Sequence, residues 1–240
     1  DSVQVSFHVI NLPPQAVTWP DDEFALASNE STSIQSLYSG PSIDTWEVEP
    51  PLPSGLSISD SGTISGTPDQ GTDWSEYRLW ANNTGGSSSS SIWIAVHDIA
   101  ADQEYLLRGM GQTSWGGWPS PVLPIGEWSF PVAFAEGGYA SEIPVISASH
   151  AGKGRILGYG HESWVYGSGG VEETAFSLRA VEWACGANAV VGLAYGAGFD
   201  RFQDDLESQG HTVQTSVSPD NLSGLDCLLD EFWNGHDDDD

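Results

Sequence analysis

The sequence contains very few basic residues. Six Lys and Arg side chains stand against 34 Asp and Glu side chains, which gives a formal charge of −28 at pH 7. A nucleic-acid partner is therefore not expected, because binding DNA or RNA requires cations that neutralise the phosphates. An anionic membrane surface is not expected for the same reason. Such an excess of carboxylates is typical of proteins that work in high salt or among divalent cations, where the repulsion is screened.

Long apolar runs are also missing. No stretch approaches the roughly 20 apolar residues of a membrane-spanning helix, so we expect no membrane span. The chain still has 39% hydrophobic residues and 11 Trp, which is enough for packed cores and excludes a wholly disordered acidic chain. Its 240 residues allow one or two domains.

Cysteine is equally scarce, with only Cys185 and Cys227 in the chain. They could form a disulfide across the second half, or they could be two small buried apolar residues, which is the interpretation that we favour. Two cysteines neither demand nor exclude an oxidising compartment. The first residue is Asp rather than Met, which suggests a processed mature chain or an excised fragment. We therefore expect an extracellular or cell-surface protein.

The first half is built from short alternating segments separated by turn residues. This pattern predicts a β-sandwich, with strands at Ser2–Val9, Glu23–Ala27, Thr45–Glu49, Leu56–Ser59, Tyr77–Asn82 and Ser91–Val96. Gly55, Gly62 and Gly66 suit turn positions with positive φ. Leu56, Ile58 and Ile64 should face the core.

Three segments of this half carry a resemblance to a known family. They are LPSGLSIS at 52–59, GTISGTP at 62–68 and ANNTGGS at 81–87, with Trp46 ahead of them. Over about residues 12–97 the chain resembles the immunoglobulin-like repeats of bacterial and archaeal surface proteins. The resemblance implies a sandwich that acts as a spacer or adhesion unit and has no active site of its own.

Residues 1–11 form a separate N-terminal segment. Val3, Val5, Phe7 and Val9 alternate with polar residues, as in the final strand 91–97, so the segment resembles the last strand of a preceding repeat. It could be an extra strand of the same sandwich, a strand that completes the sheet of a neighbouring molecule, or a boundary remnant. We predict the second role, which would make the protein self-associate.

The second half changes character after residue 98. A linker and a Gly/Trp-rich segment are expected at 98–119, an α/β domain at 120–236 and an acidic tail at 237–240. The periodicity predicts strands, two helices and a buried parallel strand. The strands are Phe130–Ala135, Val145–Ser149, Arg155–Gly160, Ala189–Ala194, His211–Val217 and Leu225–Leu229, and the helices are Glu172–Ala184 and Phe199–Gln209. Their order is that of a doubly wound parallel sheet.

This half resembles a second family. The segments PIGEWSFPV at 124–132, ASHAGKGRI at 148–156 and GYGHESW at 158–164 are similar to the amidotransferase-like domain upstream of the catalytic part in enhancin-like mucin-degrading metallopeptidases. Channel-associated factors share that domain. The resemblance covers about residues 105–235 and implies a flavodoxin/amidotransferase-like sheet, which in this chain is either incomplete or covered at its edge by another element.

The sequence does not support the catalysis associated with these families. His161-Glu162 would need a second His four residues after His161 to bind zinc, and position 165 is Val. Neither cysteine lies on a strand-to-helix elbow, where an amidotransferase nucleophile must be placed, so the resemblance implies the fold without glutaminase activity. The loop Tyr195–Gly198 lacks the spacing of a dinucleotide-binding motif. We expect no enzyme activity and no cofactor.

A few weaker candidate sites remain. The tail Asp237, Asp238, Asp239 and Asp240 is either a solvated end or a Ca²⁺ site. Trp115, Trp118 and Trp128 either fill a core or form a glycan-binding platform. Three sequons allow glycosylation at Asn29, Asn82 and Asn221.

Together these observations predict a secreted, non-enzymatic structural or adhesive protein, an element of an extracellular fibre, surface layer or adhesin. One alternative is the non-catalytic N-terminal part of a glycoprotein-directed zinc metallopeptidase. A second alternative is a carbohydrate-binding module. The source, the symmetry of any assembly and the identity of any ligand are not encoded in these patterns.

Overall fold

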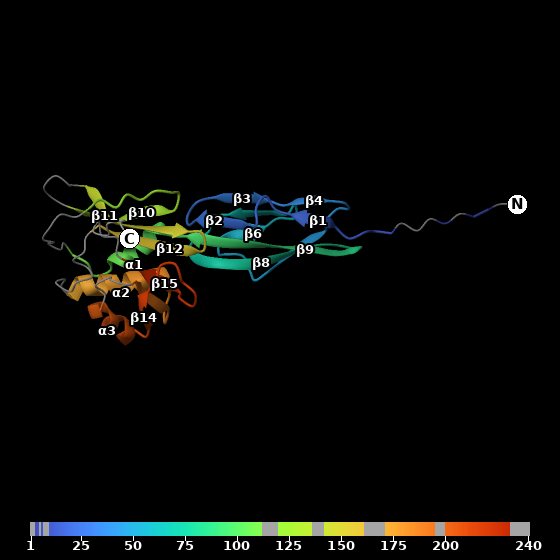
Figure 1. The fold of residues 1–240 in the computed structure, drawn as a ribbon. Helices are drawn as coiled ribbons and strands as arrows, with labels where there is room; N and C mark the ends of the chain where they lie inside the picture. Colours follow the sequence, from blue (N-terminus) through green and yellow to red (C-terminus); the bar gives the residue numbers. More distant parts are fainter. Residues whose placement is uncertain are drawn as a thin grey trace, which may run out of the picture. The chain divides into compact units, whose positions relative to one another are not determined.

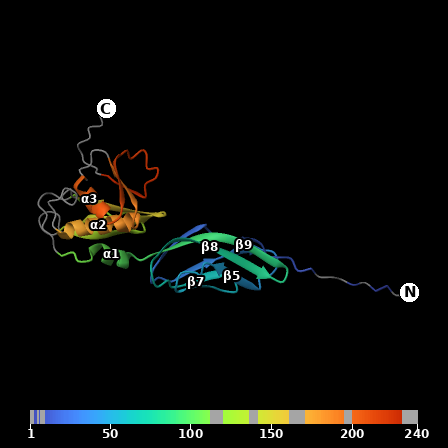
Figure 2. The ribbon, with the colours of Figure 1, turned by 90° about the horizontal axis from the view of Figure 1, so that it is seen from below.

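A computed structural model describes residues 3–4, 6, 10–111, 120–135, 142–160, 171–194 and 200–230 of the chain. It divides into two compact units, residues 1–98 and 99–240, which are described separately (Figures 1 and 2).

Unit 1 is the β-sandwich that the sequence predicts. One layer is a four-stranded sheet in the order β2-β9-β8-β5, and the other contains the three-stranded sheet β3-β7-β6. A small two-stranded sheet pairs β1 with β4. The strands are β1 (Gln15–Thr18), β2 (Glu23–Ala27), β3 (Thr32–Gln35), β4 (Leu37–Ser39), β5 (Thr45–Glu49), β6 (Leu56–Ile58), β7 (Thr63–Gly66), β8 (Thr72–Asn83) and β9 (Gly86–His97).

The core of unit 1 lies between these layers. Ile64 from β7 meets Leu79 from β8 and Ile92 from β9, and all three are fully buried. Leu56 and Ile58 pack against them, as expected. Trp46 and Trp19 meet edge to face with 6.2 Å between ring centroids, and the Trp19 indole donates to Ser90 Oγ at 2.9 Å. This hydrogen bond satisfies a polar group that burial would otherwise leave unpaired.

The expected N-terminal strand is not seen where the structure describes this segment. Val3 and Ile10 belong to no strand and are 86% and 79% exposed, while Val5, Phe7 and Val9 lie outside the described residues. The described part therefore gives no support to an extra strand within the same sandwich.

Unit 2 contains two three-stranded sheets. One is antiparallel, in the order β10-β11-β12, and the other is parallel, in the order β14-β13-β15. The elements are α1 (Ile99–Leu107), β10 (Ser129–Ala135), β11 (Ile143–Ala151), β12 (Gly154–Tyr159), α2 (Val171–Cys185), β13 (Val190–Ala194), α3 (Asp200–Ser208), β14 (Thr212–Val217) and β15 (Cys227–Leu229). The predicted buried parallel strand is confirmed as β13.

Helix α2 lies between the two sheets of unit 2 (Figure 1). Phe176 and Trp183 join the core against the antiparallel sheet, whereas Val181 joins Val191 of β13 and Leu206 of α3 in the second core. A helix that is apolar on both sides is one that is covered on both sides, and this sandwiched position explains the composition of α2.

Helix α1 corrects the expectation of a linker at 98–119. Leu106 is fully buried in the core of unit 2, and Gln103 Nε2 donates to the carbonyl oxygen of Pro131 on β10 at 2.8 Å. Leu106 is the only buried residue of α1, so the hydrophobic periodicity of the helix is weak, and the helix depends on tertiary contacts.

Candidate functional site

The outer face of the sheet β2-β9-β8-β5 carries a half-buried tryptophan surrounded by polar side chains. Leu79 and Ala81 are fully buried in the core, so Trp80 between them points to the opposite side of β8. Its register partners on the neighbouring strands are Glu47 on β5 and Ser89 on β9.

Hydrogen bonds connect the residues around this ring. The Arg78 guanidinium lies 5.4 Å from the Trp80 ring centroid, and its Nη2 donates to Ser89 Oγ at 3.1 Å. On the other side, Asn82 Nδ2 donates to Glu47 Oε1 at 3.2 Å. Trp80 therefore sits inside a frame of four polar side chains from three strands. We call Glu47, Arg78, Trp80, Asn82 and Ser89 the Trp80 frame.

A second arrangement of unit 1 holds the segment that leads into the sandwich. In the turn between β8 and β9, Asn83 Nδ2 donates to the carbonyl oxygen of Leu12 at 2.9 Å, and Thr84 Oγ1 accepts a hydrogen bond from Asn11 Nδ2 at 2.5 Å. A Cβ on Gly85 would lie 2.4 Å from the carbonyl oxygen of Asn11. The ANNTGGS signature is thus the surface on which residues 11–12 are fixed, and we call Asn83, Thr84 and Gly85 the linker clamp.

In unit 2 the main polar cluster is partly buried and joins four elements. Asp102 of α1 lies 2.6 Å from His150 Nε2 of β11, and its other oxygen accepts from Trp183 Nε1 of α2 at 2.8 Å. Arg155 of β12 donates to the carbonyl oxygen of Trp183 at 2.6 Å and stacks on its ring. This cluster fixes α1 and α2 on the antiparallel sheet.

The cluster shifts the acidity of Asp102. Burial by itself would raise its pKa, but the hydrogen bonds from His150 and Trp183, together with the charges of His150 and Arg155, outweigh it and hold the pKa below its usual value. A neighbouring contact between the two helices acts on Tyr105, whose hydroxyl donates to Glu182 at 2.7 Å. Burial and this acceptor raise the pKa of Tyr105 to about 12, so the phenol stays protonated.

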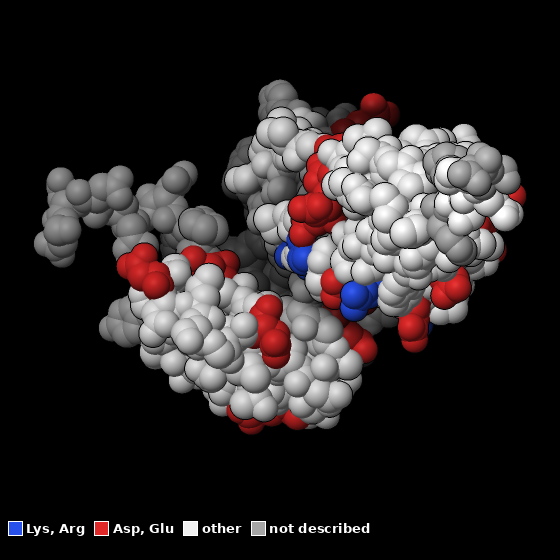
Figure 3. Space-filling model, turned by 90° about the vertical axis from the view of Figure 1, so that its right-hand side faces the viewer, with Lys and Arg blue, Asp and Glu red and all other residues white. Residues whose placement is uncertain are grey.

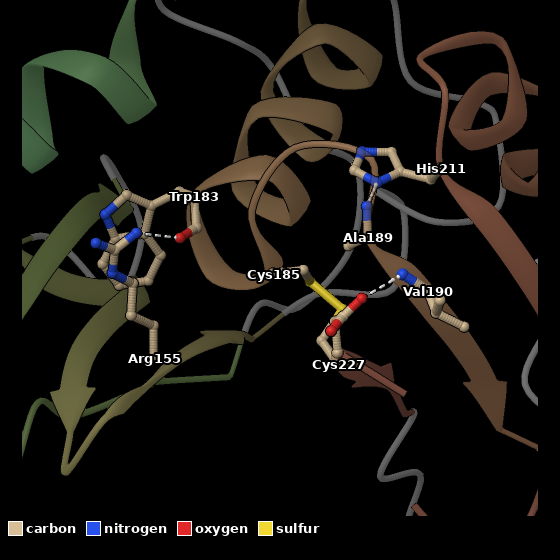
Figure 4. Close-up of a disulfide and its surroundings, with 8 residues drawn as sticks. Arg155, Trp183, Cys185, Ala189, Val190, His211 and Cys227 are labelled. Carbon is tan, nitrogen blue, oxygen red and sulfur yellow. Dashed lines mark hydrogen bonds between the residues drawn. A yellow bond between two sulfur atoms is a disulfide. The ribbon is translucent and has the colours of Figure 1, made fainter. Parts of the chain in front are cut away.

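The two cysteines form a disulfide, which corrects the favoured interpretation as two buried apolar residues. Cys185 ends α2 and Cys227 begins β15, with 5.4 Å between their Cα atoms (Figure 4). Nearby, the start of β13 is fixed by side chains, because the backbone N–H of Ala189 donates to His211 Nδ1 at 3.1 Å and that of Val190 donates to Asp226 at 2.7 Å. The disulfide ties the end of α2 to the parallel sheet, and the two hydrogen bonds tie the start of β13 to the residues that precede β14 and β15.

The other residues predicted as sites are only partly placed. Asn29 and Asn221 are exposed, while Asn82 is half-buried and its side-chain nitrogen already donates to Glu47. Trp128 is half-buried and adjoins β10. Outside the described residues lie His161, Glu162, Trp115, Trp118, the whole loop 195–198, and the tail Asp237, Asp238, Asp239 and Asp240.

The surface around the Trp80 frame, the linker clamp and the Asp102 cluster reflects the acidic composition of the chain. Figure 3 shows acidic side chains scattered over the visible surface and few basic ones. Within the described ranges, His, Cys, Asp and Glu side chains form no group of three or more that could hold a metal ion. No helix in the described part is long and apolar enough to cross a membrane.

Comparison with known proteins places the larger part of the chain in a family. A family model described as "TRPM8, N-terminal domain" (TCAF_N) matches residues 86–228. The chain belongs to the TCAF_N family. A relative from Xenopus laevis, described as "TRPM8 channel-associated factor homolog", is 31% identical over 138 residues, which is 56% of this chain and 14% of the relative. The chain therefore spans a small part of that TCAF_N protein.

The first half of the chain matches a different model, described as "Putative Ig domain", over residues 8–97. Among solved structures, a SusE-like surface-located polysaccharide-binding protein from Bacteroides thetaiotaomicron is similar at 15% identity and a TM-score of 0.30, over 36% of this chain and 15% of that chain. Immunoglobulin domains 1–4 of Sidekick-1 are similar at 17% identity and a TM-score of 0.30, over 35% and 24% of the two chains.

The Trp80 frame is the feature that sequence reasoning missed. The sequence pattern favoured Trp115 and Trp118 as exposed aromatics, because the glycine and proline residues around them are typical of loops. The available signal was the pair Arg78 and Trp80 in an alternating strand, which places both side chains on the face opposite Leu79. Their partners Glu47 and Ser89 come from other strands and are found only through the register.

Proposed function

We propose that this chain is a non-enzymatic module of an extracellular surface assembly, such as a fibre, surface layer or adhesin. The observation that carries the proposal is the linker clamp. It fixes residues 11–12 against the β8–β9 turn by hydrogen bonds and by close backbone contact at Gly85. A sandwich that rigidly holds the segment before it is suited to a series of connected modules, because a fixed linker fixes the orientation of each module relative to the next.

The N-terminal segment supplies the connection in this proposal. Val3, Val5 and Phe7 have the same spacing as the buried Ile92, Ile94 and Val96 of β9. A strand of this pattern can add to the sheet edge of a second copy through main-chain hydrogen bonds while its apolar side chains are buried. Repetition of such a head-to-tail contact gives an open fibre unless the rotation closes a ring.

The location outside the cell is supported by the Cys185–Cys227 disulfide, because disulfides persist mainly in oxidising compartments. The similarity of unit 2 to amidotransferase-like domains is also part of this proposal. It is supported by the parallel order β14-β13-β15, with α3 connecting β13 to β14.

The test is deletion of residues 1–11, followed by light scattering and negative-stain microscopy of the purified chain. We expect the full chain to form concentration-dependent assemblies and the deletion variant to be monomeric. Asn83→Ala, which frees the linker, should give shorter or irregular assemblies, and Asn221→Ala, an exposed asparagine of unit 2, should behave as the parent chain. A full chain that is monomeric at all concentrations, or a deletion variant that assembles equally well, overturns the proposal.

A second candidate is favoured by the match to a much longer relative, of which this chain covers 14%. The chain would then be the non-catalytic N-terminal part of a glycoprotein-directed zinc metallopeptidase. A His-Glu-x-x-His motif encoded downstream in the same reading frame would support this candidate, and sequencing that region tests it.

A further inference from the structure

The Trp80 frame has the chemistry of a binding surface rather than of a structural face alone. Inner-face residues of β8 explain the stability of the sandwich, because Leu79 and Ala81 are fully buried. Trp80 lies on the other side and is half-buried. Burying the whole of a large aromatic side chain would remove more apolar surface from water and stabilise the fold more. A tryptophan in such a position offers an apolar ring face or edge to a ligand.

The polar residues around the ring are held in place before any ligand arrives. Arg78 is the only Lys or Arg in residues 1–98, and it is fixed by Ser89 Oγ and by the ring itself. On the other side Asn82 is fixed by Glu47 and by Ser87, whose Oγ donates to Asn82 Oδ1 at 2.5 Å. Groups that are already oriented lose little entropy when they bind a ligand.

The inventory of donors and acceptors matches a polyol. Arg78 retains guanidinium N–H donors beyond the two, on Nε and Nη2, that donate to Ser89 Oγ. Glu47 retains carboxylate lone pairs, and Ser91 lies exposed beside Arg78 in the register. Sugar hydroxyls both donate and accept, so one sugar ring can satisfy an arginine, a carboxylate and a serine hydroxyl at once. Its C–H face can pack on the tryptophan.

The charge of the surroundings selects among possible ligands. Glu47 and Glu49 flank the site on β5, and Glu76 lies on the same strand as Trp80. An anionic polymer such as heparin or nucleic acid would be repelled by these carboxylates. A basic peptide would be repelled by the positive charge of Arg78, which lies 5.4 Å from the centroid of the Trp80 ring.

We propose that the Trp80 frame on the outer face of the sheet β2-β9-β8-β5 binds a neutral oligosaccharide. The sugar lies against Trp80, with Arg78 and Glu47 hydrogen-bonding to its hydroxyls. This inference does not depend on assembly through residues 1–11, and it concerns a different site from Trp115, Trp118 and Trp128.

The probe is a panel of soluble polysaccharides applied to the full chain by affinity gel electrophoresis. The panel contains neutral polymers (a β-glucan, a galactomannan, a mannan and a xylan), heparin as the anionic polymer and oligo-arginine as the cationic one. We expect at least one neutral polymer to retard the protein, and heparin to have no effect. Retardation by oligo-arginine alone, or by no neutral polymer, overturns the proposal.

Variants then assign the site. Trp80→Ala should weaken retardation about tenfold or more, because it removes the ring on which the sugar packs, and Trp80→Phe should restore part of it. Arg78→Lys keeps the charge but loses the planar fork, so binding should also weaken. Tyr38→Ala removes a 44% exposed aromatic from β4, in another sheet of the same unit, and should bind as the parent chain.

A folding defect is separated from a binding defect by the melting temperature of each variant. Trp80→Phe keeps the aromatic packing, so a variant that melts as the parent chain but binds less tightly reports on the ligand. Equal binding by Trp80→Ala and the parent chain overturns the proposal, even if a neutral polymer binds elsewhere on the protein.

Discussion

Gly55 and Gly66 approach each other so closely that neither position has room for a side chain. A Cβ on Gly66 would lie 1.9 Å from the carbonyl oxygen of Gly55, and a Cβ on Gly55 would lie 2.0 Å from the carbonyl oxygen of Thr67. Both residues have positive φ, 87° and 142° respectively. The glycines of the LPSGL and SGTP segments therefore act as a pair that closes the β6–β7 hairpin of the sandwich.

Replacement of Gly66 by alanine should strongly destabilise unit 1. The unfavourable φ alone costs about 1–3 kcal/mol, and the clash with Gly55 adds to it. Gly40→Ala is the matched control, because its φ is also positive at 102° but its Cβ would meet Gln15 at an ordinary 3.5 Å. Urea unfolding followed by tryptophan fluorescence measures both variants. If both variants lose the same free energy of unfolding, the close approach of Gly55 and Gly66 does not contribute to the effect of the Gly66 substitution.

Removal of the disulfide should lower the stability of unit 2. Cys185 and Cys227 are separated by 42 residues, and opening a loop of that length costs about 4 kcal/mol in the chain-entropy account. The double variant Cys185→Ser, Cys227→Ser should therefore melt at a lower temperature than the parent chain. Thiol titration of the unfolded, unreduced protein checks the premise, and two titratable thiols per chain would contradict it.

Asp102 should make the stability of unit 2 depend on pH in the acid range. Its pKa is held below the usual value in the folded state, so it contributes stability above its unfolded pKa of about 3.9, and that contribution disappears as the pH falls through the folded pKa. Asp102→Asn should cost about 1–3 kcal/mol at pH 7, since His150 loses its charged partner.

The comparison is the unfolding free energy of the parent chain and of Asp102→Asn between pH 7 and pH 2. The difference between the two should shrink as the pH falls below about 4. Asp204→Asn, in an exposed position on α3, serves as the control for a change of charge alone. A difference that stays constant with pH would show that the carboxylate of Asp102 is not ionised in the folded protein.

Divalent cations should stabilise the protein. A net charge of −28 raises the free energy of the compact state through self-repulsion, and ions that bind the folded form add stability by mass action. The melting temperature should be higher in CaCl₂ than in chelator at matched ionic strength. Removal of residues 237–240 tests whether the tail binds the cations. Equal melting temperatures in CaCl₂ and in chelator would show that the ions act only by screening the charges and bind no specific site.

The sequence by itself determined the local structure of this protein. Alternation predicted β2, β5, β8 and β9, and glycines at 55, 62 and 66 predicted turns that indeed have positive φ. The apolar run at 189–194 predicted the central parallel strand β13. These features depend on the allowed φ/ψ of single residues and on side-chain alternation, which act within a few residues of the chain.

Only the tertiary structure decided which distant residues meet. Cys185 pairs with Cys227 because the end of α2 and the start of β15 pack against the same core, and α1 forms because Leu106 is buried against the antiparallel sheet. Glu47 lies beside Trp80 because β5 and β8 share one register. A shift of one residue would turn each side chain to the opposite face, and the choice of register depends on the packing of the whole core rather than on either strand alone.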